Sequence, residues 1–500
     1  MIAFEPRRLR LAVPALLSLV LAPSLPARQE QAAAQRANPR RLVERGVEAM
    51  GGAQALRDLR TTVIEFTSTN FGLGQEETPQ SPPRATIGFG KITTDWQASR
   101  RLIEQENRPV TGVIQRTRQV IVDRIGMNDV NGTLTPTQPQ GVANVLTGMR
   151  LQPHRFLLTA LENPAGLRGL TPATFRGERM DGLRYAIGPD TMSLWFDRPT
   201  GLVVVSEIVT DDPILGDRRT LTWYTRWQGR PVKLPWQVDT EVNGRLLSHN
   251  VVTSLRENEP ADASLFAIPD SIRSRATPAP ATPPPPPSIT VTLVELAPGV
   301  WRAEGGSHHS LVVDQGNRLL VVEAPQNARR MNAVLDTLRA RFPNKPVGQV
   351  VNTHHHWDHA GGLRAALARG LPIATHARNV AFVRGIASAR KTVAPDALSR
   401  RGGDPRITLV TDMLTVGAGD SRVVLVTLPS VHAEGILAAY LPSARILFVS
   451  DVLSPGPTLS PVGSAEVVAL ARARGFTIER VAGGHGGVAT WADVEQAAGR

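Results

Sequence analysis

A run of prolines divides this chain of 500 residues into two parts that we expect to fold separately. Residues 276–287 read ATPAPATPPPPP, with five consecutive prolines at the end. Proline holds the backbone in an extended polyproline II spacer that can bury nothing. A recognition motif is the alternative, but the stretch lacks supporting basic and aromatic residues. We therefore predict a linker at 273–289 between domains at 38–272 and 290–500, although about 150 residues per domain would also allow three domains.

The C-terminal domain carries its most distinctive motif directly after an apolar segment. Residues 353–362 read THHHWDHAGG and follow the strand-like segment 347–352. In an extended segment, residues two apart point the same way. We therefore expect His354 and His356 to bind one ion together, while His355 points elsewhere.

The second half of this motif adds a carboxylate and another imidazole. A turn would let Asp358 and His359 face a second ion beside the first. Imidazole and carboxylate together suit zinc, with iron or manganese as alternatives. A solvated histidine-rich turn is the competing interpretation, but Asp358 and the following glycine pair fall where a two-metal loop needs them.

A two-metal site needs more ligands than one loop offers, and we expect them at strand ends. Glycines beside such a ligand would let the backbone approach an ion closely. Each candidate alone is weak, but together they complete a ligand set. Three candidates stand at such places: His432 after the apolar run 423–428, Asp451 after 446–450, and His485 in the glycine-rich 483–487.

These residues together resemble the metallo-β-lactamase fold superfamily. The similarity covers roughly residues 291–500 and includes LAPGVW at 296–301, which is similar to the first strands of that family. The resemblance implies an α/β domain, an αββα sandwich of two mixed sheets covered by helices, with the metals at one sheet edge. It also implies two zinc ions, the first held by His354, His356 and His432, the second by Asp358, His359 and His485, with Asp451 bridging both.

The resemblance further implies a metal-dependent hydrolase in which a metal-bridged hydroxide attacks the substrate. Asp358 would then be catalytic, because its spare oxygen could orient the hydroxide and pass a proton to the leaving group. We expect cleavage of an ester, lactone, thioester or amide of a small molecule. Zinc β-lactamase activity, or a non-catalytic metal-binding module, remains the alternative.

Differences from the typical family motifs exclude several branches of the superfamily. The chain has no cysteine, which excludes the best-known subclass of zinc β-lactamases. Another lactamase subclass lacks the bridging carboxylate that Asp451 would supply, whereas thioesterases, lactonases and general hydrolases have one. His356 stands where flavo-diiron relatives carry glutamate. The short segment between Asp451 and His485 leaves no room for the cap domain of nucleic-acid-processing relatives.

Three residues are candidates for supporting the metals or touching substrate. Glu323 closes a strand where family members often carry an acid, although a solvated glutamate would fit equally well. His309 lies in the early loop SHHS at 307–310, where we favour packing in the sheet edge for His309 and exposure for His308. Trp357 is expected to line the pocket or to anchor the ligand loop.

The N-terminal domain has a different pattern. Asn38 and Pro39 predict a helix start, and the glycines at 51–52 predict its end. Alternating residues at 221–227 and frequent turn signals predict antiparallel strands, with helical segments at 142–161 broken at Pro153. We predict an α+β domain, a curved antiparallel sheet with one or two helices. It weakly resembles periplasmic lipoprotein-carrier half-barrels, in GGAQALRDL at 51–59 and FAIP at 266–269, so a lipid or another amphiphile is an expected ligand.

The N-terminus predicts export. Arginines at positions 7, 8 and 10 precede an apolar run at 11–22 and small residues to Ala27, typical of a secretory signal over residues 1–27. The apolar run is too short for a membrane-spanning helix, although an uncleaved amphipathic anchor is an alternative. We expect a soluble periplasmic or secreted protein.

The net charge of +12 does not by itself indicate nucleic-acid binding. Only 4 of the 56 basic residues are lysine, and the arginines are scattered among acidic residues. A basic surface would still favour anionic substrates or headgroups through long-range attraction. We expect a small-molecule substrate and no nucleic-acid partner, and we make no prediction of the oligomeric state.

Overall fold

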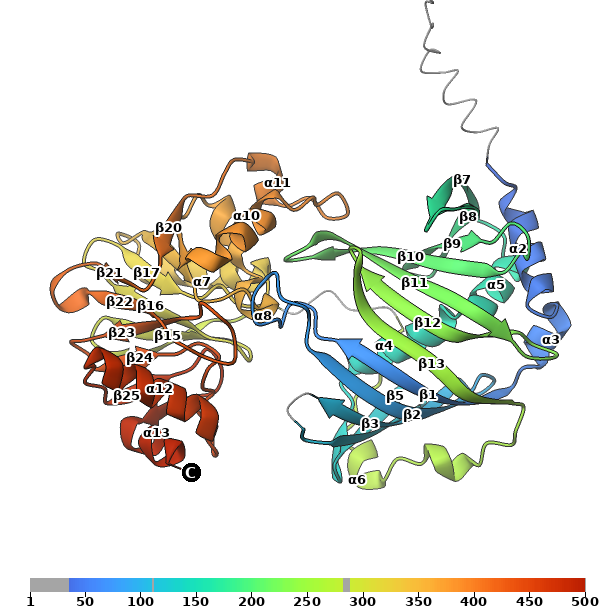
Figure 1. Cartoon of the computed structure of the whole chain (residues 1–500), viewed down its shortest axis with the longest axis horizontal. Coiled ribbons are helices and arrows are strands. Elements are labelled where there is room, and N and C mark those ends of the chain that lie inside the picture. Colours follow the sequence, from blue (N-terminus) through green and yellow to red (C-terminus); the bar gives the residue numbers. More distant parts are fainter. Residues whose placement is uncertain (1–35, 110–111, 282–287, 500) are drawn as a thin grey trace, which may run out of the picture.

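Two lobes of different architecture make up the described part of the chain (Figure 1). The computed structural model describes residues 36–109, 112–281 and 288–499. The predicted signal at 1–27 and the proline run at 283–287 lie outside these residues. Among the described residues, no helix is both long enough and apolar enough to cross a bilayer.

The N-terminal lobe is built on one antiparallel sheet, in which the described residues form 13 strands. Its order is β6-β5-β4-β3-β2-β1-β13-β12-β11-β10-β9-β8-β7, so most neighbours are joined by simple hairpins. The strands are β1 Thr61–Phe71, β2 Ala85–Asp95, β3 Arg100–Pro109, β4 Gln115–Val122, β5 Ile125–Val130, β6 Thr133–Pro136, β7 Arg168–Phe175, β8 Glu178–Ile187, β9 Asp190–Phe196, β10 Val203–Asp212, β11 Gly216–Gln228, β12 Leu234–Val242 and β13 Arg245–Glu257.

Helices begin and end where local chemistry predicts. The Asn38 side chain accepts hydrogen bonds from the backbone N–H groups of Arg40 and Arg41, and Pro39 occupies the first helical position. The predicted break at Pro153 is confirmed, because this proline begins a new helix. The helices of this lobe are α2 Pro39–Ala49, α3 Ala53–Asp58, α4 Pro139–Arg150, α5 Pro153–Glu162, the 3-10 turn η1 Ala263–Phe266 and α6 Asp270–Arg273.

The sheet curves around α4 and α5, as Figure 1 shows. Side chains of α2 to α5 form one apolar core with the inner face of the sheet, including Val47, Phe156 and Leu194. A smaller core lies on the opposite face, where Leu102 packs against Phe266 and Ile272. The predicted curved antiparallel sheet is confirmed, and its apolar inner face is largely covered by the domain's own helices.

The chain stays attached to this sheet well into the segment predicted as linker. Ala279 is only 2% exposed and belongs to the main core of the lobe. Its backbone N–H donates to the Arg124 carbonyl, and the Arg124 side chain donates back to the Ala279 carbonyl. The small alanine between two prolines is buried, whereas a fully extended spacer would leave it exposed to solvent.

The C-terminal lobe has four layers. A seven-stranded mixed sheet and a six-stranded mixed sheet of described residues face each other, with an apolar core of both inner faces between them. Helices α7 to α11 cover the first sheet, and α12 and α13 cover the second. The first sheet contains β14 Thr292–Ala297, β15 Val300–Glu304, β16 Ser310–Asp314, β17 Leu319–Val322, β18 Val347–Asn352, β19 Ile373–His376 and β20 Ile407–Val410.

This arrangement confirms the predicted αββα sandwich. The remaining elements are β21 Met413–Val416, β22 Val423–Thr427, β23 Leu437–Leu441, β24 Ile446–Phe448, β25 Arg480–Ala482, β26 Val488–Thr490, α7 Ala328–Arg341, α8 Trp357–Ala360, α9 Leu363–Ala368, η2 Ala377–Asn379, α10 Val380–Ser388, α11 Ala397–Arg401, η3 Gly419–Ser421, α12 Pro461–Arg474 and α13 Trp491–Ala498.

Candidate metal centre

The seven predicted ligands lie together at one edge of the C-terminal sandwich. The cluster at 354–359 connects β18 to α8, and the other three follow β22, β24 and β25. Two groups of side chains each place their ligand atoms within 4.8 Å of one another. They are His354, His356, His432 and Asp451 in the first group, and His308, Asp358, His359 and His485 in the second.

The first group presents imidazole nitrogens that have no hydrogen-bond partner. His354 Nε2 and His356 Nδ1 are both buried and unpartnered. The ring centroids of His354 and His356 lie 4.6 Å apart, and His432 lies 4.5 Å from His356. Because a buried polar atom without a partner is costly, this convergence fits a metal ion.

The second group brings two imidazole nitrogens close together. His359 Nε2 lies 3.0 Å from His485 Nε2. Asp358 Oδ2 lies 3.7 Å from His359 Nε2 and 4.0 Å from His485 Nε2. Histidine nitrogens and a carboxylate oxygen are the donors that zinc prefers, so this group also fits a metal ion.

Asp451 stands between the two groups. Its Oδ2 lies 3.0 Å from His432 Nε2 in the first group and 3.4 Å from His359 Nε2 in the second. Its Oδ1 lies 3.3 Å from His485 Nε2. This carboxylate therefore contacts both groups, which is the position that a bridging ligand requires.

Glu323 supports the ligands from behind. It is fully buried, and its Oε2 accepts a hydrogen bond of 3.1 Å from His359 Nδ1. Its Oε1 accepts from the hydroxyls of Thr353 and Ser450, and the Thr353 oxygen also lies 3.1 Å from His354 Nδ1. A carboxylate behind a histidine ligand fixes the orientation of the ring and its tautomer.

The charges of the site follow from burial and from these contacts. Burial lowers the pKa of His356 to about 3 and that of His354 well below its usual value, so both rings are neutral. Burial also lowers the pKa of His359, but the carboxylates of Glu323 and Asp451 outweigh it and raise the pKa to about 10. Burial raises the pKa of Asp451, but its bonds to His359 and His432 keep it far below the usual range. His354 and His356 can thus bind a cation without losing a proton.

The expected exposure of His308 is wrong, whereas His309 is buried as expected. His308, expected to be exposed, is only 8% exposed, and its Nε2 lies 3.2 Å from Asp358 Oδ2. His309, the candidate for supporting the site, is also buried, and its backbone N–H donates to the Gly484 carbonyl. The sequence SHHS offered no signal that His308 would be buried against Asp358.

Trp357 faces the N-terminal lobe. Its backbone N–H donates to the Gly74 carbonyl at 3.3 Å. A Cβ atom on Gly74, whose φ is 82°, would lie only 2.2 Å from the Trp357 indole. The tryptophan therefore anchors the ligand loop against the other lobe.

The comparison of the sequence with protein-family models agrees with this geometry. Residues 303–485 match the model of the Metallo-beta-lactamase superfamily. This part of the chain belongs to that superfamily. The match reaches from β15 to the last of the seven ligands. No curated protein matches the chain.

Solved structures similar to this superfamily domain include three bacterial metallo-beta-lactamases. The enzyme from Pontibacter korlensis is 17% identical, with a TM-score of 0.33, and the match covers 41% of this chain and 96% of that one. FIM-1 from Pseudomonas aeruginosa, in a mono-zinc form, is 16% identical, with a TM-score of 0.34 and coverage of 43% and 96%. The enzyme from Hirschia baltica is 18% identical, with a TM-score of 0.33 and coverage of 42% and 96%.

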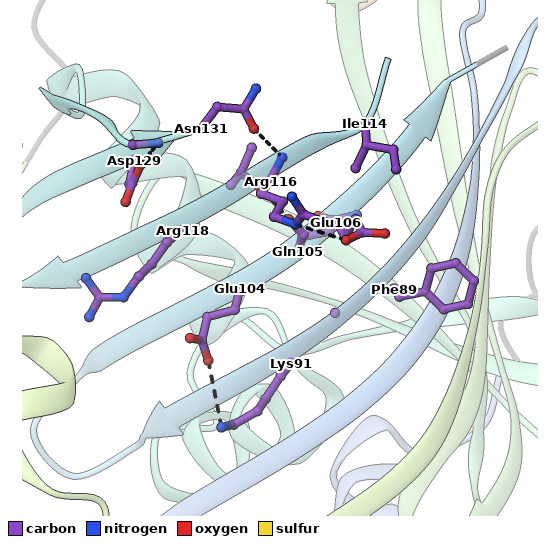
Figure 2. A pocket seen from close by; sticks show the side chains of 13 residues that line it. Phe89, Lys91, Glu104, Gln105, Glu106, Ile114, Arg116, Arg118, Asp129 and Asn131 are labelled. Atoms are coloured by element: carbon purple, nitrogen blue, oxygen red, sulfur yellow. Dashed lines mark hydrogen bonds and ion pairs between the residues drawn. The ribbon is translucent and has the colours of Figure 1, made fainter. Parts of the chain in front are cut away.

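A separate hollow of about 870 Å³ lies on the N-terminal sheet, away from the superfamily domain (Figure 2). Its lining includes the ion pairs Lys91–Glu104 and Arg116–Glu106 as well as the apolar side chains of Phe89 and Ile114. Glu104 shares the sheet face of Leu102, so the hollow opens beside η1 and not on the face that α4 and α5 cover. The lipid or other amphiphile expected for this domain stays a prediction.

Proposed function

We propose that the chain is an exported dinuclear zinc hydrolase that cleaves an ester, lactone, thioester or amide of a small molecule. The single observation that carries this proposal is the convergence of all seven ligands, with Asp451 in contact with both groups. A domain that had lost its metals would be expected to lose ligands as well. Iron or manganese would fit the same donors less well than zinc.

His354, His356 and His432 would hold one ion, Asp358, His359 and His485 the other, and Asp451 would contact both. A pair of such ions lowers the pKa of a bound water and polarises a carbonyl oxygen. Asp358 has one oxygen directed at the histidines of its group and a second oxygen directed away from them. Its side chain is 36% exposed, so the carboxylate can reach substrate and carry a proton to the leaving atom.

Metal analysis and a substrate panel test the proposal directly. The purified full-length protein should contain about two zinc ions per chain, measured by plasma mass spectrometry. A panel of aryl esters, acyl lactones, thioesters and nitrocefin, each with a chelator control, identifies the bond that is cleaved. Cleavage of nitrocefin alone would favour the β-lactamase alternative. Bound metal without turnover would favour the non-catalytic module.

Asp358→Asn separates metal binding from proton transfer, because the amide keeps an oxygen ligand but cannot take up a proton. We expect a loss of turnover of about 10²- to 10⁴-fold at zinc contents that stay near the wild-type value. Activity and zinc content are measured on the same sample. Full turnover with two bound zinc ions would show that Asp358 moves no proton.

Export is the second part of the proposal, and the composition of residues 1–27 supports it. Expression of the whole chain in a bacterium should yield a mature protein that begins near Arg28. Sequencing the N-terminus of the purified protein, after separating periplasm from cytoplasm, gives the answer. An intact Met1 in the membrane fraction would instead support an uncleaved anchor.

A further inference from the structure

One loop of the N-terminal lobe reaches the metal centre of the other lobe. The segment between β1 and β2, residues 72–84, projects from the sheet to α8, as the blue loop in Figure 1 shows. Phe71 and Ala85 are still paired at the base of this loop, and the Gly72 N–H donates to the Arg84 carbonyl. The loop is therefore an insertion at the tip of a regular hairpin.

Glu76 gives this loop a fixed shape. Its side chain is only 2% exposed. One carboxylate oxygen accepts from the Gly74 N–H at 2.8 Å, and the other is paired with Arg245 of β13. A buried carboxylate held on both sides is costly to move, so the backbone around Glu76 is held at one place.

The Glu76 carbonyl oxygen is the acceptor for a ligand of the first group. His356 Nε2–H donates to it at 2.9 Å, and His355 Nε2–H donates to it at 3.0 Å. These bonds fix the tautomer of His356, because the proton on Nε2 leaves Nδ1 as the free nitrogen lone pair. Nδ1 is the buried, unpartnered atom that faces the ligand cluster.

Gln75 makes the corresponding contact with the second group. Its Nε2 donates a hydrogen bond of 2.8 Å to Asp358 Oδ1. The other oxygen of Asp358 lies among His308, His359 and His485. The amide therefore holds the carboxylate with one oxygen toward the histidines, and Gln75 itself is exposed at the mouth of the site.

The same loop also holds the turn that carries His432. Arg84 Nη2 donates to the carbonyl of Val431 at 2.6 Å and to that of His432 at 3.3 Å. The backbone N–H of Glu434 donates to the Glu77 carbonyl at 2.8 Å. The loop thus bonds to ligand segments from both sheets of the sandwich.

We propose that the N-terminal domain contributes to the metal centre: its residues 72–84 position His356 and Asp358 to bind their ions. This inference rests on the proposed metal site. Partners behind metal ligands are worth about 10- to 100-fold in metal affinity or activity. The Glu76 carbonyl and Gln75 are such partners, and they come from another domain.

Replacing the loop tests the proposal as a whole. An Asn-Gly turn in place of residues 73–83 joins Gly72 to Arg84 by a two-residue hairpin connection and leaves the strands intact. In the full-length chain, we expect zinc affinity, measured by competition with a chelating dye, to fall about 10- to 100-fold for at least one of two ions.

The control variant breaks a contact between the lobes that lies elsewhere. Asp217, at the start of β11, accepts from the backbone N–H groups of Thr392 and Val393 and from the Thr392 hydroxyl. Asp217→Ala should leave zinc affinity unchanged. An equal loss of zinc affinity in both variants would mean that zinc binding depends on docking of the lobes in general and not on the loop. That result would overturn the proposal.

Gln75→Met tests the contact with Asp358 alone, because methionine keeps the length of the side chain and removes its amide donor. The cobalt(II)-loaded variant should differ from wild type in the position or intensity of its visible absorption bands, and turnover should fall more than KM changes. Gln80→Met is the matched control, since Gln80 is an exposed glutamine of the same loop. Its spectrum should match that of wild type.

The outcomes separate this inference from the proposed function. A wild-type chain that binds neither zinc nor cobalt overturns the proposed function and this inference with it. Suppose instead that the wild-type chain binds zinc and cobalt. If loop replacement then changes neither the zinc affinity nor the cobalt spectrum, this inference alone is overturned.

Discussion

At the scale of single residues, Glu323 connects ligands of both groups, although it is not one of the seven predicted ligands. It bonds to His359 directly, and through Thr353 it lies one step from His354. Its backbone φ of 76° is uncommon for a residue with a side chain. Such strain persists only where surrounding contacts hold the residue in place, and here the bonds of its carboxylate do so.

Glu323→Gln should therefore weaken the second group selectively. The amide can still accept one hydrogen bond, but it cannot match a carboxylate behind His359. We expect zinc affinity to fall about 10- to 100-fold, measured by chelator competition. The exposed Glu295 of β14 provides the control, because Glu295→Gln changes the same charge far from the ligands. Equal effects of both changes would contradict a specific role for Glu323.

His154 sets a dependence of stability on pH in the N-terminal lobe. It is 3% exposed beside Trp96, and burial lowers its pKa to about 3. The unfolded chain binds this proton near pH 6.5 and the folded chain does not, so acid favours unfolding. Between pH 7 and pH 5, this residue should remove about 2 kcal/mol from the free energy of unfolding.

Urea titrations followed by tryptophan fluorescence measure that difference. In His154→Phe, which keeps an aromatic ring against Trp96, the pH-dependent loss should shrink by about 2 kcal/mol. A variant as sensitive to acid as wild type would show that other groups cause the loss.

At the scale of elements, the start of α2 shows how a local cap stabilises a helix of the N-terminal core. The Asn38 side chain satisfies two backbone N–H groups that would otherwise lack partners. The buried residues of this helix include Leu42, Val43 and Val47, which join the main core of the lobe.

Asn38→Ala should lower the free energy of unfolding of this lobe by about 1 kcal/mol, because alanine cannot accept these bonds. Asn38→Asp should keep nearly all of the stability, because aspartate caps equally well. Denaturant titration of the three proteins compares them. Equal stability of the alanine and aspartate variants would contradict a capping role.

Strand β11 shows the limit of element-level prediction. The alternating pattern at 221–227 places Trp223 and Trp227 on one face. In the structure, Trp223 packs in a small cluster with Phe175 and Trp195, whereas Trp227 packs against the main core of the lobe, which contains Tyr224. Arg226 between them has a φ of 54°, which breaks the alternation. A local break of this kind leaves no trace in the hydrophobic pattern.

At the scale of the whole molecule, the contacts at 72–84 couple metal binding to both lobes. Zinc should stabilise the folded chain by about 2.7 kcal/mol at a hundredfold excess over its Kd. Amide hydrogen exchange in residues 72–84 should slow when zinc is added and recover after chelation. Unchanged exchange in this loop, with slower exchange around the ligands, would show that the two lobes respond separately.

Much of the metal centre could be predicted from the sequence alone. The spacing of His354, His356, Asp358 and His359, together with single ligands after apolar segments, depends on local geometry that strands and turns impose. The same is true of the sandwich, because its strands and helices leave a periodic signal along the chain. The predicted ligands are either close together in the sequence or follow strands whose ends meet at one edge of a sheet.

Only the tertiary structure decided the surroundings of the ligands. It placed His308 beside Asp358, Glu323 behind His359, and the Glu76 carbonyl on His356, a residue 280 positions away. Such contacts depend on how two separately folded lobes meet and on which way a side chain leaves a loop. No periodicity or spacing in the sequence encodes how the lobes meet or which way a side chain points. The sequence by itself therefore determined which atoms can bind metal. The docking of the lobes decided which contacts hold those atoms in place.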